Sequence, residues 1–551
     1  MTARTRTVVV IVLAASAAAL YLFRLGSAPV YISPDEAIIS VDAHALATTG
    51  ADRLGERLPL FFRIQMPGES RFGWFTPAIF YLSAAFMKLL PFDEATVRVP
   101  TALVAVTDIL LVFAIARELL ADDLLAIVAA VLLALTPAQF VLSRYALDYV
   151  YPTPFVLAWF WCVLRYMNRG GRRTLFVAGL CLGFGFYSYI SSIVMMPLYL
   201  AFTVGAVWLR DRRIRPAFAA MGGFCIPLLL FVLWSISHPT AFGDTAQRYA
   251  LYDPRTMTPL RGVRQYLSYA GLERLSSTYW RFFDPAFLFL TGDQMPTFST
   301  RRAGVFALSL IVLIPVGLAE IARRRRRPID LLVAVVFLTA PFAAVLVPEE
   351  PSIIRAATLL SFGALLGGYG VAALSRGRPW CRAAAVVLIA LVPIQFWLFA
   401  RDYFGDYRGR SAPWLDGNVR GALEALIARQ RATDAPMIYF ARIRSSAGLL
   451  DTRNRWMDAY WRFYLAKHHR EDLLARSHAI DTNDARSMPP GSLVLANLGD
   501  RIADGLITSG QLTVAESIQE MDGQPFFLIL VRRQDAASRL SDELRHEPAN
   551  R

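Results

Sequence analysis

The sequence predicts an all-α, multi-pass membrane domain followed by a small α/β domain at the C-terminus. Of the 551 residues, 55% are hydrophobic and only 18% are charged, whereas soluble domains carry about 25% charged residues. Apolar runs of about 20 residues, the length that crosses a bilayer, recur through residues 1–401. From residue 402 to residue 551, short apolar runs alternate with amphipathic stretches, a pattern typical of a small α/β domain.

Eleven of the apolar runs are predicted to cross the membrane. They lie at about 7–25, 98–118, 124–142, 153–168, 173–190, 192–209, 216–237, 303–322, 329–347, 356–374 and 383–400. A further run, 75–90 ("FTPAIFYLSAAFMKLL"), is short and ends beside Lys88 and Pro91. We expect this run to form a helix on the outer surface.

Arginine-rich loops set the predicted orientation of the chain. The sequences "RYMNRGGRR" (165–173), "RDRRIR" (210–215), "RRRRR" (323–327) and "RGRPWCR" (376–382) should all be cytoplasmic. Each pair of these loops is separated by an even number of the predicted spans. The N-terminus, with Arg4 and Arg6, is on the same side as these loops only if 75–90 does not cross. The alternative left open is that 75–90 crosses and a neighbouring run does not.

This parity predicts an integral protein of the plasma (inner) membrane with a cytoplasmic N-terminus. The loops 26–97 and 238–302 and the C-terminal domain are then periplasmic or extracellular. The net charge of +14 does not indicate nucleic-acid binding here, because the arginines separate membrane spans. The four cysteines lie in or beside apolar runs without metal-ligand spacing, so we expect no disulfide framework.

Two adjacent carboxylates, Asp35 and Glu36, follow the first span in the sequence "SPDEA". Ser33 as N-cap and Pro34 at the first helical position explain the pair as an ordinary helix start. The same pair at the membrane surface also suits proton abstraction or metal binding. The residues alone leave both interpretations open.

More charged and aromatic side chains are predicted on the same outer side. They are Arg71 in "GESRFGW", Arg144, Tyr145 and Asp148 in "SRYALDY", Asp293 and Arg302 in "LTGDQMPTFSTRRAG", and Arg355 in "PEEPSIIRAATLL". Interfacial arginines that snorkel to headgroups, an aromatic belt and an ordinary Gly-Asp turn explain them one by one. Their accumulation on one side exceeds what topology needs and indicates a functional site.

The order and placement of these motifs resemble the GT-C fold of polyprenyl-phosphate-dependent glycosyltransferases, especially protein O-mannosyltransferases and the aminoarabinose transferases of lipid A. "SPDEA" is similar to that family's Asp-Glu motif in the first outer loop. "GESRFGWFTPAIFYLSAAFMKLLPFDEATVRVPTAL" is similar to its segment from a basic residue to Arg-x-Pro. "SRYALDY" and "LTGD…RRAG" are similar to its Ser-Arg…Asp turn and its Gly-Asp segment. The resemblance covers about residues 1–400. It departs at Arg71 and Pro77, where the family often has Lys-Pro-Pro or His-Pro-Pro.

The resemblance implies transfer of a sugar from a polyprenyl-phosphate donor to an acceptor hydroxyl on a protein, lipid or glycan, with inversion. It implies Asp35 as general base, with Glu36 and Asp148 as further catalytic candidates. The donor phosphate would bind Arg71, Arg302 and Arg355. Arg144, Asp293 and Tyr145 are additional site candidates.

No cofactor is expected to be required, because a lipid-linked sugar is already activated and no Walker or Rossmann motif occurs. A divalent cation held by Asp35, Glu36 and Asp148 is left open. The alternative function is a transporter or flippase of a lipid-linked or anionic substrate, which predicts charged or broken mid-membrane segments in symmetric halves. The spans carry almost no central charge, and no internal repeat is visible. A non-catalytic scaffold, the third hypothesis, leaves the outer charge cluster unexplained.

Overall fold

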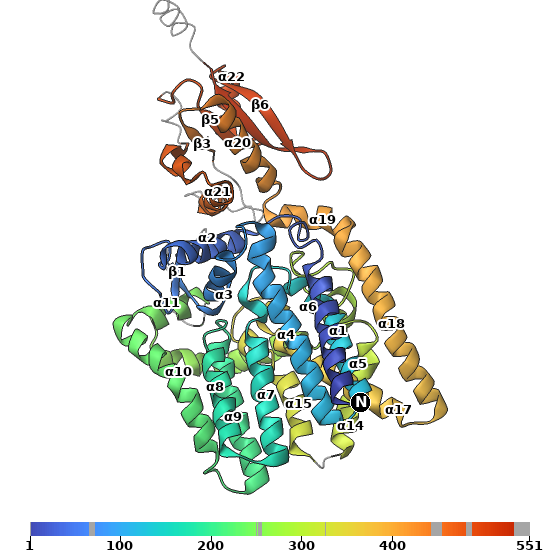
Figure 1. Ribbon diagram of the computed structural model, residues 1–551. Helices are drawn as coiled ribbons and strands as arrows, with labels where there is room; N and C mark the ends of the chain where they lie inside the picture. Colours follow the sequence, from blue (N-terminus) through green and yellow to red (C-terminus); the bar gives the residue numbers. More distant parts are fainter. Residues whose placement is uncertain are drawn as a thin grey trace, which may run out of the picture.

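The computed structural model describes residues 2–65, 72–249, 251, 256–324, 327–441, 455–480 and 487–533. It confirms the predicted fold class, because a helical membrane domain carries a small C-terminal domain with a five-stranded sheet (Figure 1). Residues 1–404 contribute the helical bundle together with the outer connections that form the candidate site.

The helices that match the predicted spans follow the expected order. They are α1 (Ala3–Leu22), α4 (Glu94–Leu120), α5 (Asp123–Ala134) with α6 (Pro137–Leu142), α7 (Pro152–Arg169), α8 (Arg172–Gly185), α9 (Ser192–Asp211), α10 (Ala217–Ser237), α14 (Leu310–Arg324), α15 (Pro328–Thr339) with α16 (Phe342–Val345), α17 (Thr358–Ser375) and α18 (Pro379–Phe404). Within the described chain, 7 helices are long and apolar enough to cross a membrane. The other predicted spans form helices that are shorter or more polar than these limits allow, namely α5–α6, α7, α8 and α14.

The run 75–90 forms a helix that is too short to cross a bilayer. Helix α3 (Ala78–Met87) has 10 residues and is therefore about 15 Å long, half of the hydrocarbon thickness of about 30 Å. It packs against α4 and against α2 (Pro34–Thr49). Helix α3 therefore packs on the bundle without spanning the bilayer.

The two long connections meet at one end of the bundle. The first contains α2, the antiparallel pair β1 (Phe62–Gln65) and β2 (Phe72–Phe75), and α3. The second contains α11 (Ala241–Arg248), α12 (Pro259–Tyr266), α13 (Tyr269–Arg281) and the π-helix η2 (Ala286–Thr291). Helix α11 contacts β2, so residues far apart in sequence share one surface (Figure 1).

The basic loops lie at the opposite end. Arg6 Nε is 3.4 Å from Asp123 Oδ2, which places the N-terminus beside the α4–α5 turn. Arg376 Nη1 is 3.8 Å from Glu320 Oε1, which joins the ends of α17 and α14. Figure 1 shows the N-terminus at this end, away from α2 and α11.

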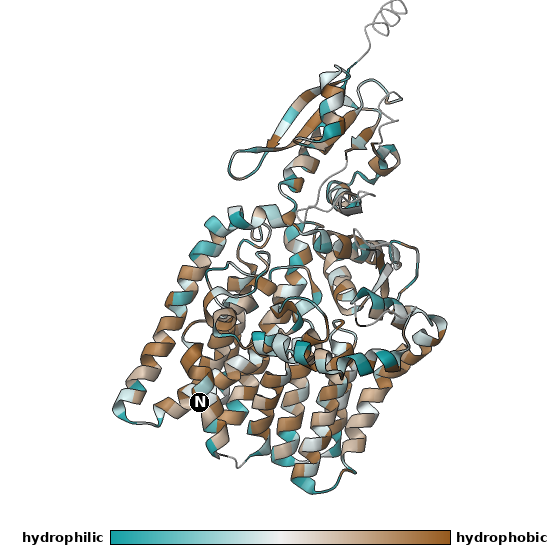
Figure 2. Cartoon of the chain, turned by 180° about the vertical axis from the view of Figure 1, so that it is seen from behind, coloured by the Kyte–Doolittle hydropathy of each residue, from teal (hydrophilic) through white to brown (hydrophobic). Residues whose placement is uncertain are grey.

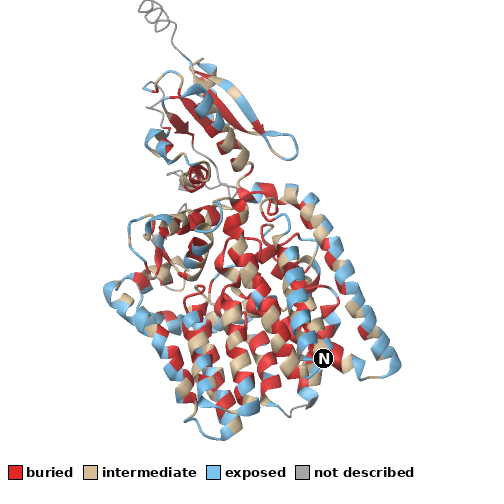
Figure 3. Cartoon of the chain, in the orientation of Figure 1, coloured by how far each residue is buried: buried red, intermediate tan, exposed pale blue. Residues whose placement is uncertain are grey.

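The outward faces of the bundle are apolar (Figure 2) and exposed (Figure 3). Helices α10 and α18 expose large hydrophobic side chains that water would solvate poorly, among them Leu233 (63%), Ile236 (74%), Val386 (67%) and Trp397 (60%). Exposed apolar patches of this extent mark an interaction with another apolar medium. The chain is therefore an integral membrane protein, and these faces contact lipid.

Small residues bring the central helices into close contact. A Cβ atom at Gly370 of α17 would lie 2.1 Å from the Leu313 carbonyl oxygen of α14, and one at Gly317 would lie 2.1 Å from the Leu366 carbonyl oxygen. Glycine is thus required at both positions, as is common where membrane helices pack closely.

The C-terminal domain rests on the first outer connection. Its sheet has the order β4-β3-β5-β7-β6, with β3 (Ile438–Phe440), β4 (Ser477–Ala479), β5 (Leu493–Asn497), β6 (Leu512–Gln519) and β7 (Pro525–Arg532) beside α20 (Val419–Thr433), α21 (Arg455–His468) and α22 (Arg501–Thr508). Helix α21 packs on α2. Lys467 Nζ lies 2.8 Å from Glu94 Oε2 and 2.7 Å from Glu424 Oε1, which ties α21 to the start of α4.

Candidate functional site

The motif "SPDEA" builds the start of α2. Ser33 Oγ accepts a hydrogen bond from the Glu36 backbone N–H at 3.2 Å, and the Ser33 N–H donates to Glu36 Oε2 at 2.9 Å. This reciprocal pair is a capping box, and Pro34 occupies the first turn. The predicted helix start is confirmed, and it places Asp35 in the first turn of α2, at the end of the bundle where the two long connections meet.

Glu36 is fully buried and fully bonded. Arg98 donates from Nε to Oε1 at 2.8 Å and from Nη2 to Oε2 at 3.2 Å, and the Ala146 N–H donates to Oε1 at 2.9 Å. Arg98 also donates to the carbonyl oxygens of Leu25, Pro29 and Tyr31. These contacts join α2, α4, the loop after α1 and the α6–α7 turn, so the environment favours a structural role for Glu36 over the catalytic role considered for it.

Asp148 lies in the 3₁₀-helix η1 (Asp148–Val150) and is only 8% exposed. Thr76 Oγ1 donates to its Oδ2 at 3.2 Å. Burial, and to a smaller extent the charge of Asp35, raises the pKa of Asp148 to about 7, against the opposing effects of Thr76 and the Arg248 guanidinium. Asp35 therefore lies close enough to Asp148 to act on its pKa.

The raised pKa of Asp148 predicts a pH-dependent stability. Between about pH 4 and pH 7 the folded protein holds a proton at Asp148 that the unfolded chain releases, so stability should fall as pH rises, by roughly 1.4 kcal/mol per pH unit. Thermal unfolding measured from pH 5 to pH 7 should show this slope in the wild type and a reduced slope in Asp148→Asn. Identical slopes for the two proteins would contradict the assignment.

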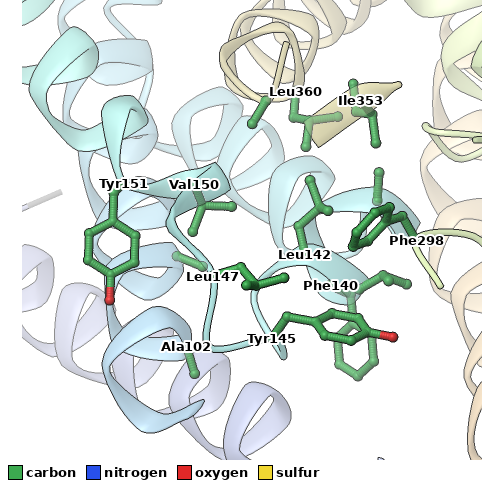
Figure 4. Close-up of a cluster of buried hydrophobic side chains, with 14 of the residues drawn as sticks. Ala102, Phe140, Leu142, Tyr145, Leu147, Val150, Tyr151, Phe298, Ile353 and Leu360 are labelled. Carbon is green, nitrogen blue, oxygen red and sulfur yellow. The ribbon is translucent and has the colours of Figure 1, made fainter. Parts of the chain in front are cut away.

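Hydrophobic packing fixes the turn that carries Asp148. Figure 4 shows Leu147 and Val150 of this turn in one cluster with Ile353 and Leu360. Tyr145 belongs to the same hydrophobic cluster. It is 1% exposed, and its hydroxyl donates to the Thr297 carbonyl oxygen at 2.8 Å. The structure thus uses Tyr145 for packing.

The Arg144 side chain is fully buried among backbone carbonyl groups. Its guanidinium donates to the carbonyl oxygens of Tyr21, Phe23 and Ala28 at 2.7, 2.7 and 3.0 Å. These acceptors lie at and just beyond the C-terminal end of α1, where helix carbonyls lack partners within the helix. Arg144 therefore ties the α6–α7 turn to α1.

Asp293 holds together two outer segments. Its Oδ2 accepts from Ser352 Oγ at 2.6 Å and from the Ile353 N–H at 2.8 Å, and its Oδ1 accepts from the Met295 N–H at 2.9 Å. Asp293 is 1% exposed. It fixes the 3₁₀-helix η3 (Ile353–Arg355), and so it positions Arg355.

Arg355 lines a small cavity of about 20 Å³. The other polar lining residues are Tyr149, Tyr189, Ser191, Ser192, Tyr199 and Thr358. Burial raises the pKa of Tyr149 well above its usual value, Asp35 and Asp148 raise it further, and Arg355 lowers it. Tyr149, which lines this cavity with Arg355, is thus within electrostatic range of both aspartates. The Arg355 guanidinium is also 2.6 Å from Glu349 Oε2.

The other two predicted phosphate-binding arginines are placed differently. The Arg302 side chain is 59% exposed, and its Nη1 lies 2.9 Å from Asp402 Oδ1 near the end of α18. The structure does not bring it into the group of Asp148, Tyr149 and Arg355. Arg71 lies outside the described residues.

Arg248 is a site residue that the sequence reasoning missed. It ends α11, its guanidinium lies 4.5 Å from the centroid of the Phe75 ring, and its positive charge lowers the pKa of Asp148. No motif surrounds Arg248 in the second connection, so only the contact between α11 and β2 reveals it. Thr76, the hydrogen-bond donor to Asp148, was missed for the same reason.

Gly73 leaves the space that the Arg248 guanidinium occupies. A Cβ atom at position 73 would lie 1.9 Å from Arg248 Nη1. We expect Gly73→Ala to displace this flexible side chain and to change thermal stability little. The sugar transfer that the sequence resemblance implies should fall about tenfold, equivalent to about 1.4 kcal/mol. Gly409→Ala is the control, because an added Cβ at this glycine has nothing within 4 Å and its backbone does not have a positive φ. Equal transfer rates for Gly73→Ala and the wild type would contradict the placement.

The described residues contain no group of three or more His, Cys, Asp or Glu side chains arranged to hold a metal ion. Of the three carboxylates considered as a ligand set, Glu36 has both oxygens bonded to Arg98 and backbone N–H groups. The site consists of two acids beside two guanidinium groups.

Comparisons with known proteins agree with this architecture. A family model described as dolichyl-phosphate-mannose-protein mannosyltransferase matches residues 75–236. The crystal structure of ArnT from Cupriavidus metallidurans bound to undecaprenyl phosphate is similar with a TM-score of 0.58 and 13% identity, over 96% of this chain and 98% of that chain. The apo state of the same protein gives a TM-score of 0.55 and 14% identity, over 95% and 98%.

A search of curated proteins finds no match. At this level of identity, the structural likeness establishes the fold. The chain has the GT-C fold, and the resemblance predicted from its sequence motifs is confirmed.

Proposed function

We propose that this protein is a membrane glycosyltransferase that moves a sugar from a polyprenyl-phosphate donor to an acceptor hydroxyl. The observation that carries the proposal is the pairing of Asp35 and Asp148 beside Arg248 and the cavity of Arg355. A carboxylate can take a proton from a hydroxyl, and guanidinium groups bind phosphate oxygens in bidentate fashion. The GT-C fold and the matching family model support this reading, as does the undecaprenyl phosphate named for the similar ArnT structure.

In the proposed reaction, Asp35 acts as general base. It accepts the proton of the acceptor hydroxyl while that oxygen attacks the anomeric carbon on the face opposite the phosphate. The bond from the anomeric carbon to the phosphate oxygen breaks, configuration inverts, and polyprenyl phosphate leaves as a phosphate monoester. Arg248 and Arg355 bind the negative charge that develops on this group, and Arg71 remains a candidate for the same task.

Asp148 has a different task because its environment differs. Two neighbouring carboxylates with separated pKa values can divide proton acceptance and proton donation between them. With a pKa of about 7, Asp148 keeps a proton in part of the population at neutral pH and can donate a hydrogen bond to a sugar or acceptor oxygen. Glu36, Arg144 and Asp293 hold the segments that carry these groups. No step of the proposal passes through a metal or another cofactor.

The proposed orientation places this site outside the cytoplasm. Basic loops are retained in the cytoplasm, and they lie at the end of the bundle opposite to Asp35 and Asp148. The N-terminus is then cytoplasmic, and residues 402–551 form a periplasmic or extracellular domain. This domain stands on α2 through α21, close to where an acceptor would approach Asp35.

A transfer assay with purified protein in lipid nanodiscs tests the proposal. A panel of polyprenyl-phosphate sugars, hexoses and pentoses, is incubated with peptide, lipid and glycan acceptors, and the transferred sugar is quantified. We expect transfer from at least one donor. Absence of transfer from every donor, together with translocation of the lipid-linked sugar in proteoliposomes, would replace the proposal by the transporter alternative.

A further inference from the structure

Helices α12 and α13 of the second connection expose a row of large apolar side chains. In α12, Leu260 and Val263 lie one turn apart, and Leu267 follows the helix. In α13, Leu272 and Trp280 continue the row. All five side chains are more than half exposed. Residues three, four, seven or eight apart share one face of a helix, so both helices are amphipathic with the apolar face outward.

Hydrogen bonds fix these helices beside the end of a segment that can cross the membrane. The Tyr266 hydroxyl of α12 donates to the Leu346 carbonyl oxygen at 3.0 Å, and the Tyr279 hydroxyl of α13 donates to the Leu338 carbonyl oxygen at 3.0 Å. The segment Pro328–Val345, formed by α15 and α16, is long and apolar enough to span a bilayer. Helix α13 also packs on α16. Helices α12 and α13 therefore lie at the level where this span reaches the headgroups.

The apolar row of α12 and α13 adjoins a surface that contacts lipid. Leu331, Leu338 and Phe342 of the neighbouring span are large, apolar and exposed, as are the outward faces of α10 and α18. Tyr279 binds the backbone of Leu338, so α13 continues this surface at its end. Amphipathic helices in such a position bury their apolar face by about 5–10 Å between headgroups and acyl chains. A lipid surface is therefore the partner that fits the row.

The charges of α12 select the kind of lipid. Helix α12 carries Arg261 and Arg264 and no acidic residue. Each arginine follows directly after an apolar residue of the row, and both are exposed. In α13, by contrast, Arg281 is paired with Glu350. The guanidinium groups of α12 can thus reach the phosphates of headgroups while the apolar row contacts acyl chains.

We infer that α12 and α13 form a binding surface for anionic phospholipids of the phosphatidylglycerol class. The apolar row would enter the boundary of the acyl chains, and Arg261 and Arg264 would bind phosphodiester oxygens. Helix α12 offers no carboxylate to the ammonium group of a zwitterionic lipid, which favours the anionic class. Electrostatic attraction to anionic lipids adds to the burial of the apolar face.

One turn links this surface to the candidate site. Arg281 of α13 pairs with Glu350, and the adjacent Glu349 Oε2 lies 2.6 Å from the Arg355 guanidinium. The lipid-binding surface therefore adjoins the segment that carries Arg355, at the end of the bundle where the two long connections meet.

Hydrogen–deuterium exchange of the full-length protein in nanodiscs tests this inference. Nanodiscs of phosphatidylcholine are compared with nanodiscs of an equal mixture of phosphatidylcholine and phosphatidylglycerol. We expect amide exchange in residues 256–281 to be at least about tenfold slower in the mixture, because lipid binding lowers the population of locally opened helix. High salt should remove the difference by screening the exposed arginines. Equal exchange rates in the two membranes would overturn the assignment to anionic lipid.

Variants locate the effect within the protein. The double variant Arg261→Gln/Arg264→Gln should exchange at the same rate in both membranes. Arg501→Gln, which removes an exposed arginine of the C-terminal domain, is the control and should keep the difference of the wild type. A lipid effect that persists in the double variant would overturn the assignment to α12.

The number of protein copies in each nanodisc separates lipid from protein as the partner. Nanodiscs that hold one copy should show the full lipid effect. Protection of residues 256–281 that requires two copies would assign the apolar row to a second copy and overturn the inference. Exchange is recorded without donor or acceptor, so the outcome is independent of glycosyl transfer.

Discussion

Asp35→Asn should reduce sugar transfer by about 10²–10⁴-fold, the usual contribution of a general base. Asparagine keeps the size of the side chain but cannot accept the proton of the acceptor hydroxyl. The capping box of α2 is formed by Ser33 and Glu36, so the helix start should persist in the variant. The measurement is the initial rate of transfer in nanodiscs, with thermal unfolding recorded on the same samples.

The matched control for this substitution is Asp434→Asn. The Asp434 side chain is 91% exposed in the C-terminal domain, and its replacement should leave the transfer rate unchanged. The account requires a loss in kcat with donor binding retained, because the proton is accepted only in the reacting complex. Equal turnover by Asp35→Asn and the wild type would exclude Asp35 as the base.

Glu36→Ala should lower the free energy of unfolding by about 3–5 kcal/mol, the usual effect of removing one partner of a buried ion pair. Glu36 and Arg98 are both 0% exposed, so the substitution leaves an uncompensated guanidinium inside the protein. Loss of Glu36 also removes acceptors from the N–H groups of Ser33 and Ala146. The measurement is the denaturant or thermal unfolding of the purified protein in detergent.

A surface pair supplies the comparison for Glu36. Arg462 Nε lies 2.9 Å from Asp458 Oδ2 in α21, with side chains 36% and 45% exposed, and Asp458→Ala should cost at most about 1 kcal/mol. The double variant Glu36→Leu/Arg98→Leu should recover part of the stability, because no charge then remains buried. If Glu36→Ala is no less stable than Asp458→Ala but loses transfer, Glu36 would be catalytic after all.

Most of the fold was predicted from the length of the apolar runs and from the position of the arginines. A membrane span needs about 20 apolar residues, and basic loops stay in the cytoplasm. The interruption inside the predicted span 124–142 was not foreseen. There α5 ends at Ala134 and α6 begins at Pro137 after Thr136. Proline at the first turn of a helix is a recognisable start signal. Because the apolar composition is continuous across residues 124–142, the run was predicted as one unbroken helix.

The candidate site was predicted only where it depends on residues that are close together in the sequence. "SPDEA" predicts the helix start that holds Asp35, because capping depends on residues three apart. The partner of Glu36 is 62 residues away at Arg98, and composition does not distinguish a buried arginine from one that reaches lipid headgroups. Arg144 and Asp293 are recognisable as candidates in the sequence, but their hydrogen bonds to distant backbone atoms depend on tertiary packing.

The most direct test of the proposed function is a single-turnover experiment with enzyme in excess over a polyprenyl-phosphate sugar. Nanodiscs that contain the wild-type protein are mixed with donor and acceptor, and polyprenyl phosphate and glycosylated acceptor are quantified over time. The account predicts that both products form together in equal amounts in the wild type and that Asp35→Asn forms them at least about 10²-fold more slowly. Donor that binds but stays intact in the wild type with every acceptor would contradict it.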